Sequence, residues 1–320
     1  MFHLNLSGSS YCRFNLLAVW RSVGAKSAFV QDDERVQMFG ESLIRFLKDP
    51  IRLTGAIAAD PAEAWIKFQD RLAERNERLR PIHMYEAEQG WEHRFHQVLG
   101  CPWPCEATAD FNSLWSEVMR LMQAKGIRPG PESFGSWNDG DAGFVRAIWC
   151  LVGHLRPENV VETGVGHGVT SRFVLEALER NGAGHLSSID VPPMDSELRK
   201  QVAVAVDNRL PQRWTYIKGS SRRRLPALLS RLRQIDIFVH DSLHSARNVR
   251  FELDRAWRML RPGGAIVVDD VDANDGFHSF TKTFPAAASI VCEAEPLHPD
   301  LRRFNKKGLF GIILKSPTLQ

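Results

Sequence analysis

Most of the information about the fold lies in Val160-Val161-Glu162-Thr163-Gly164-Val165-Gly166-His167-Gly168-Val169-Thr170-Ser171. The apolar start is typical of a buried strand, and the glycines at alternate positions let the backbone turn tightly and approach a ligand closely. A helix is predicted to follow, with Thr170 or Ser171 near its start. A strand, a glycine turn and a helix in this order place helix N–H groups against a nucleotide-like ligand.

Two kinds of nucleotide site compete at this turn, and a turn without any ligand is the third alternative. A dinucleotide fingerprint reads G-x-G-x-x-G, whereas this turn reads G-x-G-x-G and follows Glu162. The acidic residue and the spacing resemble motif I of the class I S-adenosylmethionine-dependent methyltransferases. The resemblance implies that Gly164, Gly166 and Gly168 wrap the amino-acid and ribose part of that cofactor, with Glu162 and Ser171 as further cofactor-binding residues.

Composition limits the classes of protein that fit the chain. Its 320 residues are 43% hydrophobic, which is enough for a full core and more than one structural unit. A net charge of +3 gives no reason to expect nucleic acid as the main partner. Cys101 and Cys105 do not have zinc-knuckle spacing, and the scattered cysteines suit a reducing compartment. The apolar bursts in residues 1–26 are too short for a signal peptide or a membrane span. A cytoplasmic protein is expected.

The first region, residues 1–130, reads as helical. Residues 1–30 have little periodicity, and partial disorder is expected there. Helical spacing predicts three helices, at residues 32–48, 60–80 and 111–125, the second beginning at Asp60 as N-cap. The apolar faces of these helices, including Trp65, Phe68 and Leu72, are expected to pack against a core.

The second region, residues 131–320, alternates strand-like and helical runs, which predicts a parallel sheet with helices on both faces. Strands are expected at residues 159–162, 186–189, 215–218, 235–240 and 265–268. Helices are expected at 143–155, 171–180, 195–210, 225–232 and 246–260. Two last strands, 289–293 and 308–314, are close enough in sequence for an antiparallel hairpin. The methyltransferase resemblance implies this same α/β architecture, a Rossmann-like, seven-stranded, mostly parallel sheet ending in the hairpin.

Two strand ends after the glycine turn offer further cofactor contacts. Asp190 ends the second strand, where an acidic residue can bind the two ribose hydroxyls of a nucleoside. An NAD enzyme needs the same acid, and an Asp before two prolines also starts turns. Ser220 follows the third strand, where the resemblance implies contacts with adenine; an ordinary loop is the alternative.

The fourth and fifth strands end in Asp241, His244 and the pair Asp269-Asp270. Carboxylates that converge at one sheet edge repel unless they are neutralised, and oxygen ligands favour a cation such as Mg²⁺. The pattern resembles the catechol-type and macrocin- or mycinamicin-type O-methyltransferases, within the branch called methyltransferase family 24. The resemblance implies that Asp241, Asp269 and Asp270 bind the metal, that Asp241 also contacts the cofactor, and that His244 is the base.

Each of these roles has an alternative. The Asp269-Asp270 pair fits a helix cap or turn, Asp241 fits substrate or cofactor orientation without metal, and His244 fits a hydrogen-bonded loop histidine.

Together these features predict an S-adenosylmethionine-dependent methyltransferase that acts on a hydroxyl of a small metabolite or sugar, with assistance from Mg²⁺. The helices before residue 130 are expected to cover the acceptor pocket or to form a homo-oligomer contact. Two other functions are kept as alternatives. One is an NAD-dependent oxidoreductase, which the missing G-x-x-G spacing disfavours. The other is a non-catalytic binding protein on the same fold, which the retained acidic residues disfavour.

Overall fold

The computed structural model describes residues 60–77, 82–127, 141–193, 196–207, 209–284, 286–295 and 308–317. Residues Ala59–Gln320 form one compact unit. The predictions for residues 1–59 lie outside the described residues, as does the domain boundary near residue 130, which stays a prediction.

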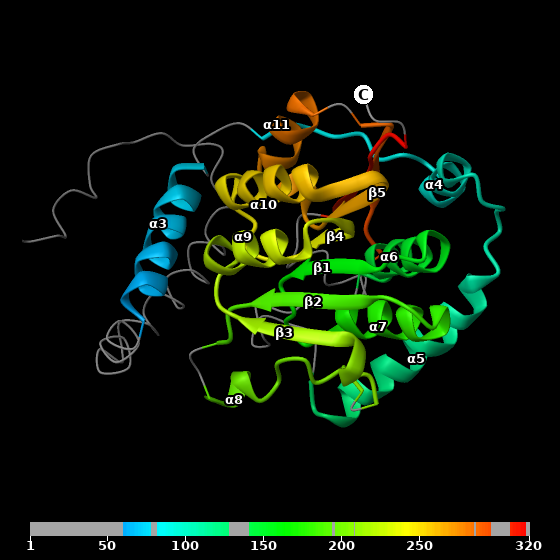
Figure 1. The fold of residues 1–320 in the computed structure, drawn as a ribbon, viewed down its shortest axis with the longest axis horizontal. Coiled ribbons are helices and arrows are strands. Elements are labelled where there is room, and N and C mark those ends of the chain that lie inside the picture. Colours follow the sequence, from blue (N-terminus) through cyan, green and yellow to red (C-terminus); the bar gives the residue numbers. More distant parts are fainter. Residues whose placement is uncertain are drawn as a thin grey trace, which may run out of the picture. The chain divides into compact units, whose positions relative to one another are not determined.

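A seven-stranded sheet in the order β3-β2-β1-β4-β5-β7-β6 forms the centre of this unit (Figure 1). Strands β1 to β5 are parallel, and β7 runs antiparallel to both of its neighbours, β5 and β6. The strand bounds are β1 Asn159–Thr163, β2 His185–Asp190, β3 Trp214–Lys218, β4 Ile235–His240, β5 Leu260–Val268, β6 Ala288–Glu293 and β7 Leu309–Leu314. Six strands match the predicted positions to within one residue, β5 begins five residues earlier than predicted, and the closing hairpin is confirmed.

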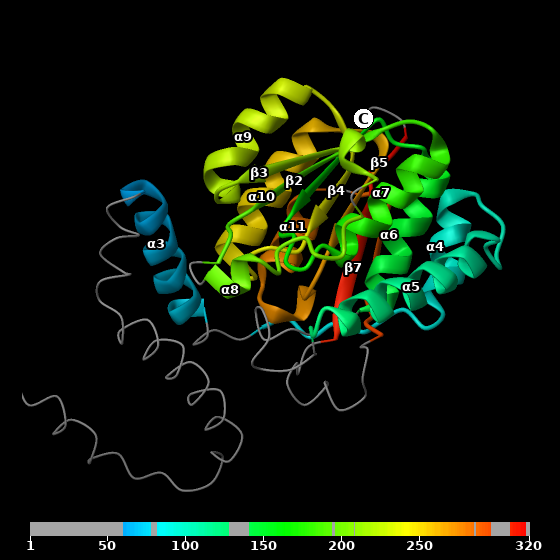
Figure 2. The same ribbon diagram turned by 90° about the horizontal axis from the view of Figure 1, so that it is seen from below.

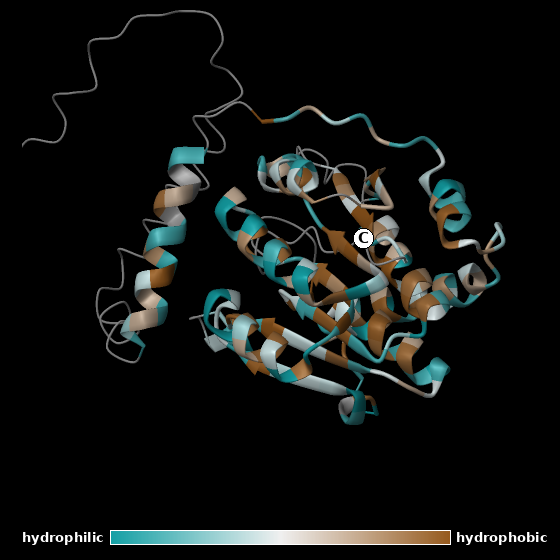
Figure 3. Cartoon of the chain, turned by 45° about the horizontal axis from the view of Figure 1, so that its top comes forward, coloured by the Kyte–Doolittle hydropathy of each residue, from teal (hydrophilic) through white to brown (hydrophobic). Residues whose placement is uncertain are grey.

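Helices cover both faces of the sheet, as Figure 2 shows. One face carries α4 (Trp91–Leu99), α5 (Ala107–Ala124), α6 (Ala142–Leu155) and α7 (Val169–Asn181). The other carries α9 (Ser221–Leu232), α10 (Ala246–Met259) and α11 (Gly276–Thr283). Strand side chains alternate between the two cores, so that Ile237 and Val239 face the first and Phe238 faces the second. Hydrophobic residues accordingly gather on the strands and on the helix faces that meet them (Figure 3).

The prediction of a helix at residues 195–210 was wrong. Only α8 (Ser196–Arg199) is helical, and turns follow it. Valine at every second position from Val202 lowers helix propensity. The N–H groups of Ala203 and Ala205 donate to the carbonyl oxygens of Gly166 and His167, both at 2.9 Å. The segment therefore packs on the glycine turn instead of forming its own helical hydrogen bonds.

The prediction for the apolar face of α3 (Pro61–Glu77) was also wrong. Trp65, Phe68 and Leu72 are 59%, 51% and 45% exposed. The helix is attached through its acidic residues instead, because they contact the N-terminal ends of α9 and α10. The helix start was predicted correctly, since Asp60 Oδ1 accepts a hydrogen bond from the N–H of Glu63.

Two helices had no sequence prediction, namely α4 and α11, both of them short. Two short 3₁₀ turns, η1 (Pro211–Arg213) and η2 (Val271–Ala273), complete the described elements. Within the described ranges, none of the helices combines the length and apolar character needed to cross a membrane.

Candidate functional site

The glycine turn lies at the carboxyl end of β1, between β2 and β4, where the direction of strand order reverses. Open α/β sheets bind their ligands at this point. Gly164 has φ +86°, and a Cβ there would lie 1.8 Å from the backbone oxygen of Asp241. The chain after β4 therefore passes directly over the turn, which only glycine permits. Gly166 and Gly168 also have positive φ angles, of 49° and 82°.

Glu162 connects the strand before the glycine turn to the neighbouring elements α7 and β2. Its carboxylate accepts hydrogen bonds from Ser171 Oγ on α7 and Ser188 Oγ on β2, both at 2.6 Å. Burial raises the pKa of Glu162 to about 7, against the effect of these two hydroxyl donors. Because Glu162 and Ser171 are fully buried, we describe them as residues that position the turn. Their predicted contact with the cofactor stays a prediction.

Asp190 and the glycine turn form one unit. The N–H groups of Val165, Gly166 and Val191 stabilise the Asp190 carboxylate, while burial raises its pKa to about 6. Its second oxygen, Oδ2, is buried, and no hydrogen-bond partner lies near it among the described residues. An acceptor oxygen is thus available at the end of β2, where ribose hydroxyls were predicted to bind.

Three of the predicted acidic and basic side chains converge at the ends of β4 and β5. The ligand atoms of Asp241, His244 and Asp269 all lie within 4.8 Å of one another. Asp241 Oδ1 is 3.9 Å from His244 Nε2. Burial, together with the nearby carboxylates of Asp270 and Asp241, raises the pKa of Asp269 well above its ordinary value. Asp270 does not belong to the converging group; its backbone is left-handed, with φ +50°, at the start of η2.

A buried polar network beneath this group centres on Glu252 of α10. The Glu252 carboxylate accepts hydrogen bonds from Thr163 Oγ1 at 2.5 Å, His240 Nδ1 at 2.7 Å, Ser242 Oγ at 2.8 Å and Asn248 Nδ2 at 2.9 Å. Burial alone would raise the pKa of Glu252, but His240 and the hydroxyl donors outweigh it and lower the pKa to about 2. The ionised carboxylate therefore fixes the ends of β1 and β4 and the first residues after β4.

Two further contacts hold the segment that carries His244. Asn274 Nδ2, in the loop after β5, donates to the His244 carbonyl at 3.0 Å. Asn248 Nδ2 donates to the Leu243 carbonyl at 3.2 Å. The loops after β4 and β5 are thus tied together, so Asp241, His244 and Asp269 are held near one another.

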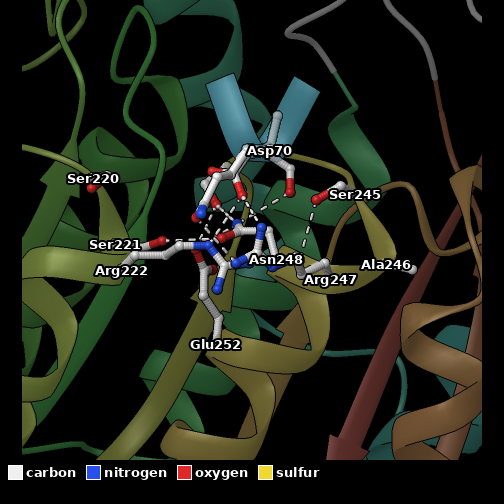
Figure 4. Close-up of polar contacts among 12 residues, drawn as sticks. Asp70, Ser220, Ser221, Arg222, Ser245, Ala246, Arg247, Asn248 and Glu252 are labelled. Carbon is white, nitrogen blue, oxygen red and sulfur yellow. Dashed lines mark hydrogen bonds and ion pairs between the residues drawn. The ribbon is translucent and has the colours of Figure 1, made fainter. Parts of the chain in front are cut away.

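Helix α3 contacts the starts of α9 and α10 through its carboxylates. Glu63 accepts from Ser220 Oγ at 3.0 Å, at the start of α9. Glu77 accepts from the N–H of Ala246 at 2.8 Å, in the first turn of α10. Between them, buried Asp70 accepts from Arg222 Nε at 3.1 Å, and Figure 4 shows this contact beside Asn248 and Glu252. Negative charge at a helix N-terminus is stabilising.

Sequence reasoning missed several of these residues, chiefly Glu252, His240, Asn274 and the carboxylates of α3. Glu252 looks like an ordinary charged residue of an amphipathic helix, and three of its four partners come from β1, β4 and the loop after β4. The one available signal was β4, whose apolar run Ile237-Phe238-Val239 is followed by the polar strand end His240. A polar side chain that closes a fully buried strand requires a buried partner.

Comparison with known proteins identifies the family to which the domain is similar. Residues 161–271 match the family model described as a methyltransferase domain. A protein of Mycolicibacterium vanbaalenii named "Putative O-methyltransferase" is 31% identical over 170 residues, 49% of this chain and 70% of that protein. One of the same name from Mycobacterium sp. (strain JLS) is 31% identical over 151 residues, 44% of this chain. This chain spans 64% of the length of that relative.

Among solved structures, the O-methyltransferase TomG from Streptomyces achromogenes, in complex with SAM, has 16% sequence identity and a TM-score of 0.47. The superposition covers 73% of this chain and 100% of TomG.

Proposed function

This chain belongs to the methyltransferase family, and we propose that it transfers a methyl group from S-adenosylmethionine to a hydroxyl of a small metabolite or sugar. The observation that carries the proposal is the glycine turn joined to Asp190, with a buried carboxylate oxygen left to accept from a ligand. A dinucleotide fold in the order 3-2-1-4-5-6 would lack the antiparallel β7 between β5 and β6. The topology therefore favours the methyltransferase over the NAD-dependent oxidoreductase.

We assign the cofactor to the carboxyl ends of β1, β2 and β3. Asp190 would accept hydrogen bonds from the ribose hydroxyls, and the turn at Gly164–Gly168 would lie against the amino-acid part. Ser220 would lie near the adenine; its hydroxyl donates a hydrogen bond to Glu63. When bound, S-adenosylmethionine supplies a methyl group on a positively charged sulfur. The protein then gains rate by aligning the acceptor oxygen with that methyl.

His244 is assigned as the base that accepts the proton of the acceptor hydroxyl at Nε2. Asp241 Oδ1 is 3.9 Å from that nitrogen and would stabilise the imidazolium that forms. An alcohol is a poor nucleophile until its proton leaves, so this step is the chemical contribution of the chain itself.

Asp241 and Asp269 would hold a divalent cation such as Mg²⁺, with Asp270 as the third predicted ligand outside the converging group. The fit rests on the crowded carboxylates, because burial and then repulsion from Asp270 and Asp241 raise the pKa of Asp269, and a cation would relieve that repulsion. A bound cation would lower the pKa of the acceptor hydroxyl and fix its position.

Helix α3 is assigned to the acceptor side of the site, since Glu77 accepts from the N–H of Ala246, two residues after His244. If α3 covers the acceptor, Glu77→Gln raises the KM for the acceptor and leaves the affinity for S-adenosylhomocysteine unchanged. An unchanged KM for the acceptor together with a weaker affinity for S-adenosylhomocysteine would contradict this placement. A homo-oligomer contact through the N-terminal helices stays a prediction, with exposed Trp65, Phe68 and Leu72 as its candidate surface.

The proposed activity is tested with S-adenosylmethionine labelled in the methyl group and a panel of catechols, sugars and polyketide alcohols. Transfer of label into an alkali-stable methyl ether supports O-methylation of a hydroxyl. Label found only in an ester or an N-methyl product contradicts the acceptor class. His244→Ala serves as the control for label transferred without the enzyme's base.

A further inference from the structure

A second group of ligating side chains lies where α4, the loop after it and α6 meet. His96 comes from α4, Cys105 from the loop, and His154 from the last turn of α6. Their ligand atoms all lie within 4.8 Å of one another, and Cys105 Sγ is 3.4 Å from His154 Nε2. Helix α6 ends four residues before β1 begins. The group therefore lies toward the amino edge of the sheet, whereas the candidate active site is at the carboxyl edge.

The hydrogen bond of His96 shows which of its ring nitrogens carries the hydrogen. His96 Nδ1 is 2.7 Å from the carbonyl oxygen of Glu92, which can only accept, so Nδ1 carries the hydrogen. The lone pair of a neutral ring is then on Nε2. His96 is 1% exposed, and within the described part of the chain Nε2 has no hydrogen-bond partner. Leaving a buried acceptor without a hydrogen-bond partner is destabilising.

Metal-binding histidines usually have this arrangement, with one ring nitrogen bonded to a backbone carbonyl and the other facing the metal. The free lone pair of His96 points to a missing ligand, and a sulfur and a second imidazole lie within reach. Cys105 is 7% exposed, and the thiol of buried Cys150 lies near it and offers a further sulfur.

We propose that His96, Cys105 and His154 bind a transition-metal ion of the zinc class. Imidazole and thiolate donors select such ions, whereas Mg²⁺ prefers oxygen. The ion would connect α4 and the loop at Cys105 to α6, a helix of the methyltransferase core, across 58 positions of sequence from His96 to His154. Its role would be to fix these N-terminal elements onto the domain. This site is independent of the proposed methyl transfer.

The test begins with the full chain purified without a polyhistidine tag or chelator, with its metal content measured by inductively coupled plasma mass spectrometry. After Zn²⁺ is added and free ion removed, one equivalent is expected to remain bound. Replacement by Co²⁺ is expected to give a thiolate-to-cobalt charge-transfer band and intense visible bands of a tetrahedral site. These measurements use the wild-type chain and need no variant to fold.

Variants locate the metal. Cys105→Ser and His154→Gln are expected to lose the bound ion and the charge-transfer band. Cys292→Ser is the matched control, because Cys292 is a free, fully buried thiol on β6, and it is expected to keep both. A wild-type chain that retains no Zn²⁺ after reconstitution, or a Cys105→Ser chain that retains the full cobalt spectrum, would overturn the proposal. In either case the three side chains are only packed together, with one hydrogen bond between Cys105 and His154.

Discussion

Replacing Glu252 by Gln removes one charge from the centre of the buried network while nearly preserving its shape. One carboxylate oxygen accepts from Thr163 and His240, and the other from Ser242 and Asn248. Whichever way the new amide is oriented, its NH₂ group faces the N–H of either His240 or Asn248. The hydroxyls can rotate, but those N–H groups cannot become acceptors while His240 donates from Nδ1.

Two estimates of the cost agree. The folded protein lowers the pKa of Glu252 from 4.5 to about 2, which corresponds to about 3 kcal/mol of folding free energy at neutral pH. A buried donor left without an acceptor costs about 1–3 kcal/mol, and more when a charge was involved. We therefore expect Glu252→Gln to lower the free energy of unfolding by about 3 kcal/mol.

The pH dependence has a defined sign. Because the folded-state pKa is depressed, the stabilisation by Glu252 is complete above about pH 4.5 and is lost as the pH falls toward 2. The difference in stability between wild type and Glu252→Gln should shrink over that range.

Urea unfolding, followed by tryptophan fluorescence and circular dichroism, measures both quantities. The matched control is Glu197→Gln, because Glu197 is 73% exposed beside Lys200; it should change stability by less than about 0.5 kcal/mol. A loss of less than about 1 kcal/mol in Glu252→Gln at neutral pH, or a difference that acid does not change, would refute the reasoning.

Three further predictions concern the site. Asp190→Ala should weaken binding of S-adenosylmethionine by about 1.5–3 kcal/mol in calorimetry. The affinity of the wild-type chain should decrease as the pH is lowered below about 6, because Asp190 then takes up a proton. An unchanged affinity in Asp190→Ala removes Asp190 from the ribose site. His244→Ala should lower kcat by about 10²–10⁴ and leave the Kd of S-adenosylhomocysteine unaltered, while equal turnover rules out an essential base. Excess chelator should abolish methyl transfer and Mg²⁺ should restore it, so full activity in chelator contradicts the metal assignment.

The sheet could be predicted from sequence because its signals are local. β4 is buried along its whole length, and its apolar residues Ile235 and Ile237–Val239 mark the strand up to its last residue, His240. The glycine turn could also be predicted, since the three glycines that allow positive φ angles lie within the seven residues that begin at Glu162. Asp190 ends its strand, Asp241 and Asp269 directly follow theirs, and parallel strands bring their carboxyl ends to one edge.

What could not be predicted depends on contacts between distant segments. The residues after α8 form hydrogen bonds with Gly166 and His167 in place of helical ones. The periodicity of the sequence gives no sign of these contacts. The apolar residues of α3 indicated a core-facing helix, but carboxylates such as Glu77 make its contacts. His96, Cys105 and His154 have no local spacing in common, and only the fold of α4 against α6 brings them together.

The central claim, an S-adenosylmethionine site at the glycine turn, is tested most directly by calorimetric titration of the purified chain with S-adenosylhomocysteine and, in parallel, with NAD⁺. We predict saturable binding of one S-adenosylhomocysteine per chain, weakened in Asp190→Ala, and no binding of NAD⁺. Tight binding of NAD⁺ with none of S-adenosylhomocysteine would contradict the account.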